Sequence, residues 1–180
     1  MPFTLQEGWL SPARHCESPH QDDRPDADIS LLVVHCISLP PGRFGGPYID
    51  DLFMGRLDSS AHPYFEGIYQ LRVSAHCLIR RDGELVQYVP FHRRAWHAGL
   101  SCFEGRDKCN DFSVGIELEG TDTGDYTPAQ YRVLAEVTRA LMQAYPAITP
   151  SRITGHSDIA PGRKTDPGPG FDWTRFRALL

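Results

Sequence analysis

The sequence predicts an α/β (α+β) fold: a single domain, residues 1–180, with a central mixed β-sheet flanked by helices. Residues 29–37 form a continuous apolar, β-branched run, which is typical of a strand buried on both faces. Residues 113–120 alternate between apolar and polar side chains, which indicates a second strand. Thr127 is followed by Pro128 and Gln130, the spacing of a capped helix start. Strands followed by a helix favour a sheet with helices packed on it.

Composition limits the class of protein. At 180 residues, one domain is the default, and 41% hydrophobic with 23% charged residues is ordinary for a globular chain. The net charge of -5 gives no reason to expect nucleic acid or an anionic membrane as a partner. No apolar run is long enough to span a bilayer, and the first residues lack a secretion signal. We therefore expect a cytoplasmic protein whose five cysteines are reduced.

The other elements follow from local patterns. Residues 1–28 are polar, contain proline and lack a period, so they predict an irregular arm packed on the domain. A short helix is expected over 49–57. Strands over 73–80 and 85–89 flank an Asp-Gly turn and predict a hairpin. The capped helix carries a buried apolar stripe of Leu134, Val137 and Leu141, and it stops at Pro146. A final helix begins after its cap, Asp172.

Two histidines and an aspartate are the candidate metal ligands. His35 lies at the end of the apolar strand, where α/β sheets open onto a cleft; alternatively it is a satisfied core histidine. Residues 154–170 are rich in glycine and proline, which excludes a helix or an inner strand and predicts a stiff loop. His156 opens this loop at the end of a short strand-like run over 152–154. Asp166 closes the loop before Pro167, which restricts the backbone of Asp166. Alternatively, this is a surface loop with an incidental histidine.

Two histidines, a carboxylate and an open position are typical of a hydrolytic zinc site. Such a site needs a general base, for which Glu117 is the best candidate, and a cation near the developing oxyanion, for which we choose Lys164. Glu117 shares its strand face with Glu119, and the usual meaning of such a face is solvated carboxylates. For Glu119 we expect a solvated or supporting role. We expect His76 and His97 to be structural or to line the pocket.

Five motifs resemble one known family. They are His35 followed by ISLPPG, SAHCLIRRDG from Ser74, WHAG from Trp96, CNDFSVGIELEGTD from Cys109 and KTDPGP from Lys164. Together they resemble the AmpD-type 1,6-anhydro-N-acetylmuramyl-L-alanine amidases of bacterial peptidoglycan recycling. This family belongs to the type 2 amidase superfamily, which includes the peptidoglycan recognition proteins. The resemblance covers nearly the whole chain and implies a mixed sheet with zinc in a cleft at one end.

The resemblance also implies a role for individual residues. The implied zinc ligands are His35, His156 and Asp166, and the implied catalytic pair is Glu117 and Lys164. The implied substrate contacts are Cys36, Arg72, Lys108 and Ala160, and we expect Trp96 to form a wall of the cleft. Cys36 stands where the family usually has Asn, Lys108 where it has Arg, and Gly162 where Glu is common. These departures concern substrate contacts and leave the zinc chemistry unchanged.

The expected function is zinc-dependent hydrolysis of the amide between (1,6-anhydro-)N-acetylmuramic acid and the L-alanine of a small muropeptide. Three alternatives remain open at this stage. One is a peptidoglycan-binding module without catalysis. A non-haem iron oxygenase could use His156 with Asp158, although no second histidine follows. A glycosidase could use Glu117 and Glu119, about 7 Å apart on one strand face, although this leaves the three candidate ligands unexplained.

Overall fold

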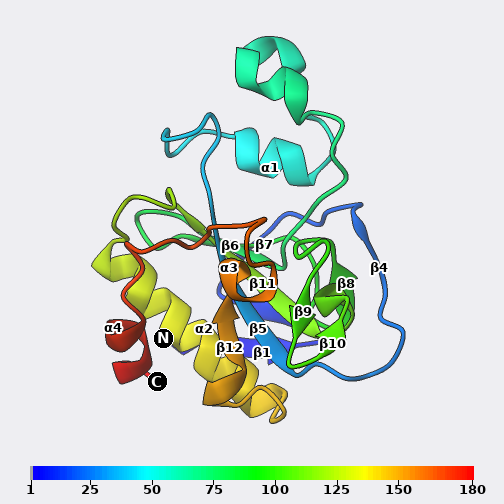
Figure 1. Ribbon diagram of the computed structural model, residues 1–180, viewed down its shortest axis with the longest axis vertical. Helices are drawn as coiled ribbons and strands as arrows, with labels where there is room; N and C mark the ends of the chain where they lie inside the picture. Colours follow the sequence, from blue (N-terminus) through cyan, green and yellow to red (C-terminus); the bar gives the residue numbers. More distant parts are fainter. Residues whose placement is uncertain (1) are drawn as a thin grey trace.

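The computed structural model describes residues 2–180 and shows there a six-stranded mixed sheet with helices on both faces (Figure 1). The strands are β1 Thr4–Gln6, β2 Trp9–Ser11, β3 Arg14–His15, β4 Gln21–Asp23, β5 Leu31–Ile37, β6 Cys77–Ile79, β7 Leu85–Gln87, β8 Arg93–Ala95, β9 Cys102–Phe103, β10 Arg106–Asp107, β11 Ser113–Glu119 and β12 Ile153–Gly155. The α-helices are α1 Tyr48–Phe53, α2 Pro128–Ala144, α3 His156–Ile159 and α4 Trp173–Ala178. Short 3-10 helices are η1 Ser59–Ala61, η2 Pro63–Gly67, η3 Cys109–Asp111 and η4 Pro150–Arg152.

The strand order of the main sheet is β12-β5-β11-β6-β7-β3. Strands β12, β5, β11 and β6 run parallel to one another. Strands β6 and β7 form the antiparallel hairpin that the Asp-Gly turn predicts. The predicted mixed sheet is therefore confirmed. Because β12, β5 and β11 are parallel, their carboxyl ends lie at one edge of the sheet, and residues that follow these strands meet there.

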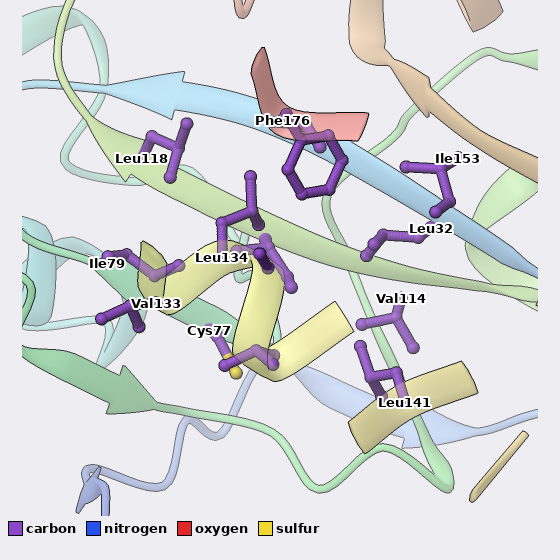
Figure 2. Close-up of a cluster of buried hydrophobic side chains, with 14 of the residues drawn as sticks. Leu32, Cys77, Ile79, Val114, Leu118, Val133, Leu134, Leu141, Ile153 and Phe176 are labelled. Carbon is purple, nitrogen blue, oxygen red and sulfur yellow. The ribbon is translucent and has the colours of Figure 1, made fainter. Parts of the chain in front are cut away.

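One face of the sheet packs against α2 and α4 (Figure 2). The apolar positions of the two long strands supply Leu32, Val114 and Leu118, and α2 supplies Leu134 and the rest of its buried stripe. All of these side chains are almost fully inaccessible to water, which is the main stabilising contribution to such a layer. On the opposite face, α1 covers one apolar cluster, and a second cluster lies beside α3 and η3.

Local sequence signals set the starts of α2 and α4 as predicted. The Thr127 hydroxyl accepts a hydrogen bond from the Gln130 amide, and the Gln130 side chain accepts one from the Thr127 amide, so the capping box is confirmed. Asp172 accepts a hydrogen bond from the Arg175 amide and begins α4. In the described part of the chain, none of the helices combines the length and apolarity needed to cross a membrane.

Four segments differ from the sequence prediction. The helix expected over 49–57 is shorter and ends at Phe53. The N-terminal arm contains the short strands β1 to β4, whose partners include the distant β7 and β8, so local sequence could not reveal them. The strand expected over 73–80 is ordered as a strand only at β6. The strand-like run over 152–154 corresponds to β12, but the prediction of a loop after it is wrong for His156–Ile159, which forms α3. The Asp158 side chain accepts from the Gly155 amide and starts that helical turn before Pro161 is reached.

Glu119 is not a solvated carboxylate. It is only 2% exposed, and Arg80 donates a hydrogen bond of 2.8 Å to it. The amides of Gly45 and Arg81 donate to the same carboxylate. The alternation of β11 predicts correctly which face Glu119 occupies, but the arginine that covers it comes from the end of another strand. Glu119 therefore joins the loop after β5 to the β6–β7 hairpin.

This ion pair yields a stability prediction. Arg80→Met leaves a buried carboxylate without its cation, so we expect the free energy of unfolding to fall by about 3–5 kcal/mol. Arg56→Met removes the exposed, water-screened pair with Asp51 and should change the free energy of unfolding far less. Urea denaturation of both variants measures the difference. Equal, small losses would contradict the structural role that we assign to the buried pair.

Candidate metal centre and cleft

Three side chains converge at the carboxyl edge of the sheet. The Nδ1 atoms of His35 and His156 are 3.0 Å apart, and each lies within hydrogen-bond distance of the same carboxylate oxygen, Oδ2 of Asp166, at 3.1 and 3.2 Å. Both histidines are buried, and Asp166 is partly buried. Among the described residues, this is the one group of three His, Cys, Asp or Glu side chains that could hold a metal ion.

The hydrogen bonds around this group fit a cation. The backbone carbonyl of Ala98 can only accept, so the Nε2 atom of His156, 3.0 Å away, carries a hydrogen. In the neutral imidazole the Nδ1 atom then has a lone pair, and it faces the carboxylate of Asp166, which is also an acceptor. Two acceptors in contact repel each other unless a cation lies between them. Two imidazole nitrogens and one carboxylate oxygen are donors that suit zinc.

The fold explains why the two histidines meet. His35 is within β5, and His156 follows β12 directly, at the start of α3. Gly155, the last residue of β12, pairs with Val34, which precedes His35. The chain therefore delivers His156 beside His35, although the two are far apart in sequence. The structure thus places His35 near the carboxyl end of β5 and His156 directly after β12, close to the expected strand-end positions.

Asp166 is held by contacts between two loops. The Tyr126 hydroxyl donates a hydrogen bond of 2.6 Å to the carbonyl of Pro167, directly after Asp166. Thr165 donates to Asp122 at 2.6 Å. Gly168 and Gly170 touch the backbone of residues 122–125 so closely that a Cβ at either position would overlap it, and Gly168 also has a positive φ of 83°. These glycines allow the ligand loop to pack against the loop after β11.

Glu117 lies beside the candidate metal site through strand register. In the parallel pairing of β11 and β5, Glu117 is the partner of His35. Its side chain is 9% exposed, and its Oε2 atom is buried without a hydrogen-bond partner. Burial raises the pKa of Glu117 well above the usual range, the charge of Asp166 raises it further, and Lys164 lowers it. A buried carboxylate with a perturbed pKa beside a cleft is a candidate catalytic group.

These residues border a cavity of about 580 Å³. Residues 40–72, which include α1 and η2, stand over this end of the sheet in Figure 1. They provide an apolar wall, which includes Leu52, Phe53, Tyr64, Ile68 and Leu71. The opposite side carries His35, Glu117, His156, Lys164 and Asp166. An apolar wall facing a few polar groups is the usual make-up of a small-molecule site.

The other predicted site residues occupy different places. Trp96 lines the cavity and stacks on His20, with ring centroids 5.9 Å apart. Arg72 and Lys108 are exposed and are not among the residues that line the cavity. Ala160 is buried at the end of α3, outside the lining, and its carbonyl accepts from the amides of Arg163 and Lys164. The cavity therefore brings together the candidate ligands, Glu117, Lys164 and Trp96.

Cys36 also borders the cavity, but it differs from His35 in the direction it faces. Its side chain packs against the cluster beneath α2, as strand alternation predicts for the residue after His35. Burial raises the pKa of the Cys36 thiol to about 12, so the side chain is a neutral thiol. In the described chain Cys36 is not part of the metal-binding group, and the structure gives no support to a thiolate ligand.

The geometry also decides between alternative chemistries. Asp158, the carboxylate that an iron site would need, accepts hydrogen bonds from the Thr154 hydroxyl and the Gly155 amide instead of joining the two histidines. Glu119, the second carboxylate that a glycosidase would need, is engaged by Arg80. An iron site that uses Asp158 and a glycosidase that uses Glu119 therefore each lack a free carboxylate.

Sequence reasoning expected His97 to be structural or to line the pocket, and His97 does line the cavity. It did not reveal that the Nδ1 atom of His97 lies 2.8 Å from the Nε2 atom of His35. Asn110 accepts hydrogen bonds from the amides of His97 and Ala98. One signal was available: Gly115 interrupts a strand, which often marks a close approach, and an added Cβ there would overlap the His97 ring. The pairing partner, however, cannot be inferred from the strand alone.

Comparison with known proteins agrees with this geometry. A family model described as N-acetylmuramoyl-L-alanine amidase matches residues 25–169. The 1,6-anhydro-N-acetylmuramyl-L-alanine amidase AmpD of Citrobacter freundii is 69% identical over 177 residues, 98% of this chain and 94% of the relative. A crystal structure of a selenomethionine AmpD derivative superposes with a TM-score of 0.96 at 68% identity, covering 98% of this chain and 99% of the other. The amidase AmiD of Escherichia coli, solved with anhydro-N-acetylmuramic acid-L-Ala-D-γ-Glu-L-Lys, gives a TM-score of 0.62 at 26% identity, over 99% of this chain and 65% of AmiD. The chain belongs to the N-acetylmuramoyl-L-alanine amidase family.

Proposed function

We propose that this protein is a zinc-dependent amidase that hydrolyses the bond between 1,6-anhydro-N-acetylmuramic acid and L-alanine in small muropeptides. The observation that carries the proposal is the meeting of His35, His156 and Asp166 beside the unpaired carboxylate of Glu117. The AmpD relative and the substrate named in the AmiD complex supply the reaction and the substrate class. A binding module without catalysis would not need either the third ligand or a buried, unpaired carboxylate.

The side chains suggest a division of roles. Zinc held by His35, His156 and Asp166 would polarise the amide carbonyl and acidify the attacking water. Glu117 accepts the proton of that water and returns it to the leaving amine. Lys164 places a positive charge in the cleft, where the oxygen of the amide becomes negative. The products are an anhydromuramyl sugar and a peptide with a free N-terminal L-alanine.

The substrate contacts and the location of the protein are part of the same proposal. Trp96 borders the cavity and would touch the ligand there, whereas Cys36 would meet the ligand only at the edge of the cavity, because its side chain packs against the cluster beneath α2. Arg72, Lys108 and Ala160 lie outside the lining, so they would reach only the parts of a muropeptide that project beyond the cavity. We propose a cytoplasmic role in peptidoglycan recycling, by analogy with the AmpD relatives.

The reaction is tested with a purified anhydromuramyl tripeptide and mass spectrometry. We expect the substrate to gain one water and to split into the anhydromuramyl sugar and the intact peptide. An inactive Glu117→Gln sample is the control for spontaneous hydrolysis. Cleavage within a sugar would refute the amidase, and tight binding without turnover would support the binding module instead.

The metal is tested by elemental analysis. We expect about one zinc per chain in the wild type and much less in His156→Ala, because that variant removes one of three protein ligands. His92→Ala changes an exposed histidine outside the group and should keep its zinc. The same zinc content in wild type and His156→Ala would show that the metal, if any, is bound elsewhere.

The general base is tested by Glu117→Gln, which keeps the shape of the side chain but cannot accept the proton. We expect kcat to fall by at least ~10²-fold while zinc content and the unfolding midpoint are retained. Glu66→Gln, at an exposed carboxylate in η2, should leave kcat unchanged. An unaltered kcat in Glu117→Gln would exclude Glu117 as the base.

A further inference from the structure

A single dipeptide contacts both histidine ligands from behind. The Nδ1 atom of His97 is 2.8 Å from the Nε2 atom of His35. The carbonyl of the next residue, Ala98, is 3.0 Å from the Nε2 atom of His156. Each ligand therefore uses one ring nitrogen toward the candidate metal and the other toward residues 97–98. His35, His156 and Ala98 are buried and His97 is partly buried, so water has limited access to these hydrogen bonds.

We propose that His97 and Ala98, held in place by Asn110, form a positioning element that presents the Nδ1 lone pairs of both histidines to the metal. The inference rests on the metal site proposed above and adds residues that do not touch the metal. The Ala98 carbonyl requires a hydrogen on Nε2 of His156, and His97 can impose the same tautomer on His35 by accepting at Nδ1. Without these partners, a proton on Nδ1 would compete with the metal.

The ring of His97 is itself held in one state. Its Nε2 atom lies 3.0 Å from the hydroxyl of Ser113, which can accept the hydrogen and leave Nδ1 free to accept from His35. Its plane is perpendicular to that of His35, with ring centroids 4.9 Å apart. Gly115 lies beneath the ring and provides the space it fills. The packing and the hydrogen bonds thus favour one orientation.

Asn110 holds the backbone of this element. Its Oδ1 atom accepts from the amides of His97 at 3.1 Å and Ala98 at 2.8 Å, so a single oxygen orients both residues. Arg163 also donates to the Ala98 carbonyl, at 2.6 Å, and this leaves one lone pair for His156. Because Asn110 touches neither ligand, its loss affects the metal only through residues 97–98. Outer partners of metal-bound histidines typically contribute 10- to 100-fold to metal affinity.

The test is the zinc affinity of full-length variants, measured by competition with a chelator of known affinity. Asn110→Leu should weaken zinc binding roughly 10- to 100-fold, the range typical of such outer partners. Asn110→Asp keeps an acceptor oxygen and should restore most of the loss. Gln87→Leu is the matched control, because Gln87 is a buried amide that accepts from the Leu10 backbone away from the metal site. It should destabilise the fold without changing zinc affinity.

His97→Phe provides a second arm that keeps an aromatic ring but removes the acceptor for His35. We expect weakened zinc binding and a shifted visible spectrum in the cobalt-substituted protein, since the orientation of His35 changes. Wild-type zinc affinity in both Asn110→Leu and His97→Phe would overturn the positioning element, as would an Asn110→Asp variant no better than Asn110→Leu. A wild type that binds no zinc would instead overturn the proposed metal site itself.

Discussion

The parallel pairing of β5 with β11 is the constraint on which the candidate site depends. This register places Glu117 beside His35 and puts the side chains of both on the face that opens onto the cavity. A shift of one residue would turn Glu117 into the apolar layer beneath α2 and expose Leu118 in its place. The alternating apolar residues of β11 prevent that shift, because Val114, Ile116 and Leu118 are completely buried or nearly so. Core packing therefore sets the geometry of the catalytic carboxylate.

The third ligand depends on a different kind of contact. Asp166 comes from a loop, and a loop lacks the hydrogen-bond ladder that aligns strands. Its position is set instead by backbone contact with the loop after β11, which Gly168 and Gly170 make possible, and by the hydrogen bond from Tyr126 to Pro167. The loop that contacts Gly168 and Gly170 continues directly from β11. The same strand therefore orients both Glu117 and the loop that holds Asp166 in place.

Sequence patterns were sufficient to predict the elements that depend only on residues close together in the chain. The buried strand, the alternating strand and the capped helix were all predicted, and so was the loop that carries Asp166, although His156 lies in α3 and not in that loop. Features that need a distant partner were not predictable. The Glu119 carboxylate looked solvated because nothing in β11 indicates that Arg80 covers it. The short strands of the N-terminal arm and the contact of His97 with His35 likewise depend on residues far away in the chain.

One face of β11 shows why the pattern alone was ambiguous. Ser113, Gly115, Glu117 and Glu119 share that face at every second position, and all four are buried. Their neighbours give them different functions: Ser113 bonds to His97, Gly115 makes room for its ring, and Glu119 binds Arg80. Only Glu117 keeps a buried oxygen without a partner among the described residues. A polar strand face is therefore not equivalent to a solvated one. Its chemistry is decided by which of its groups the fold leaves unpaired, and here that group lies beside the candidate metal ligands.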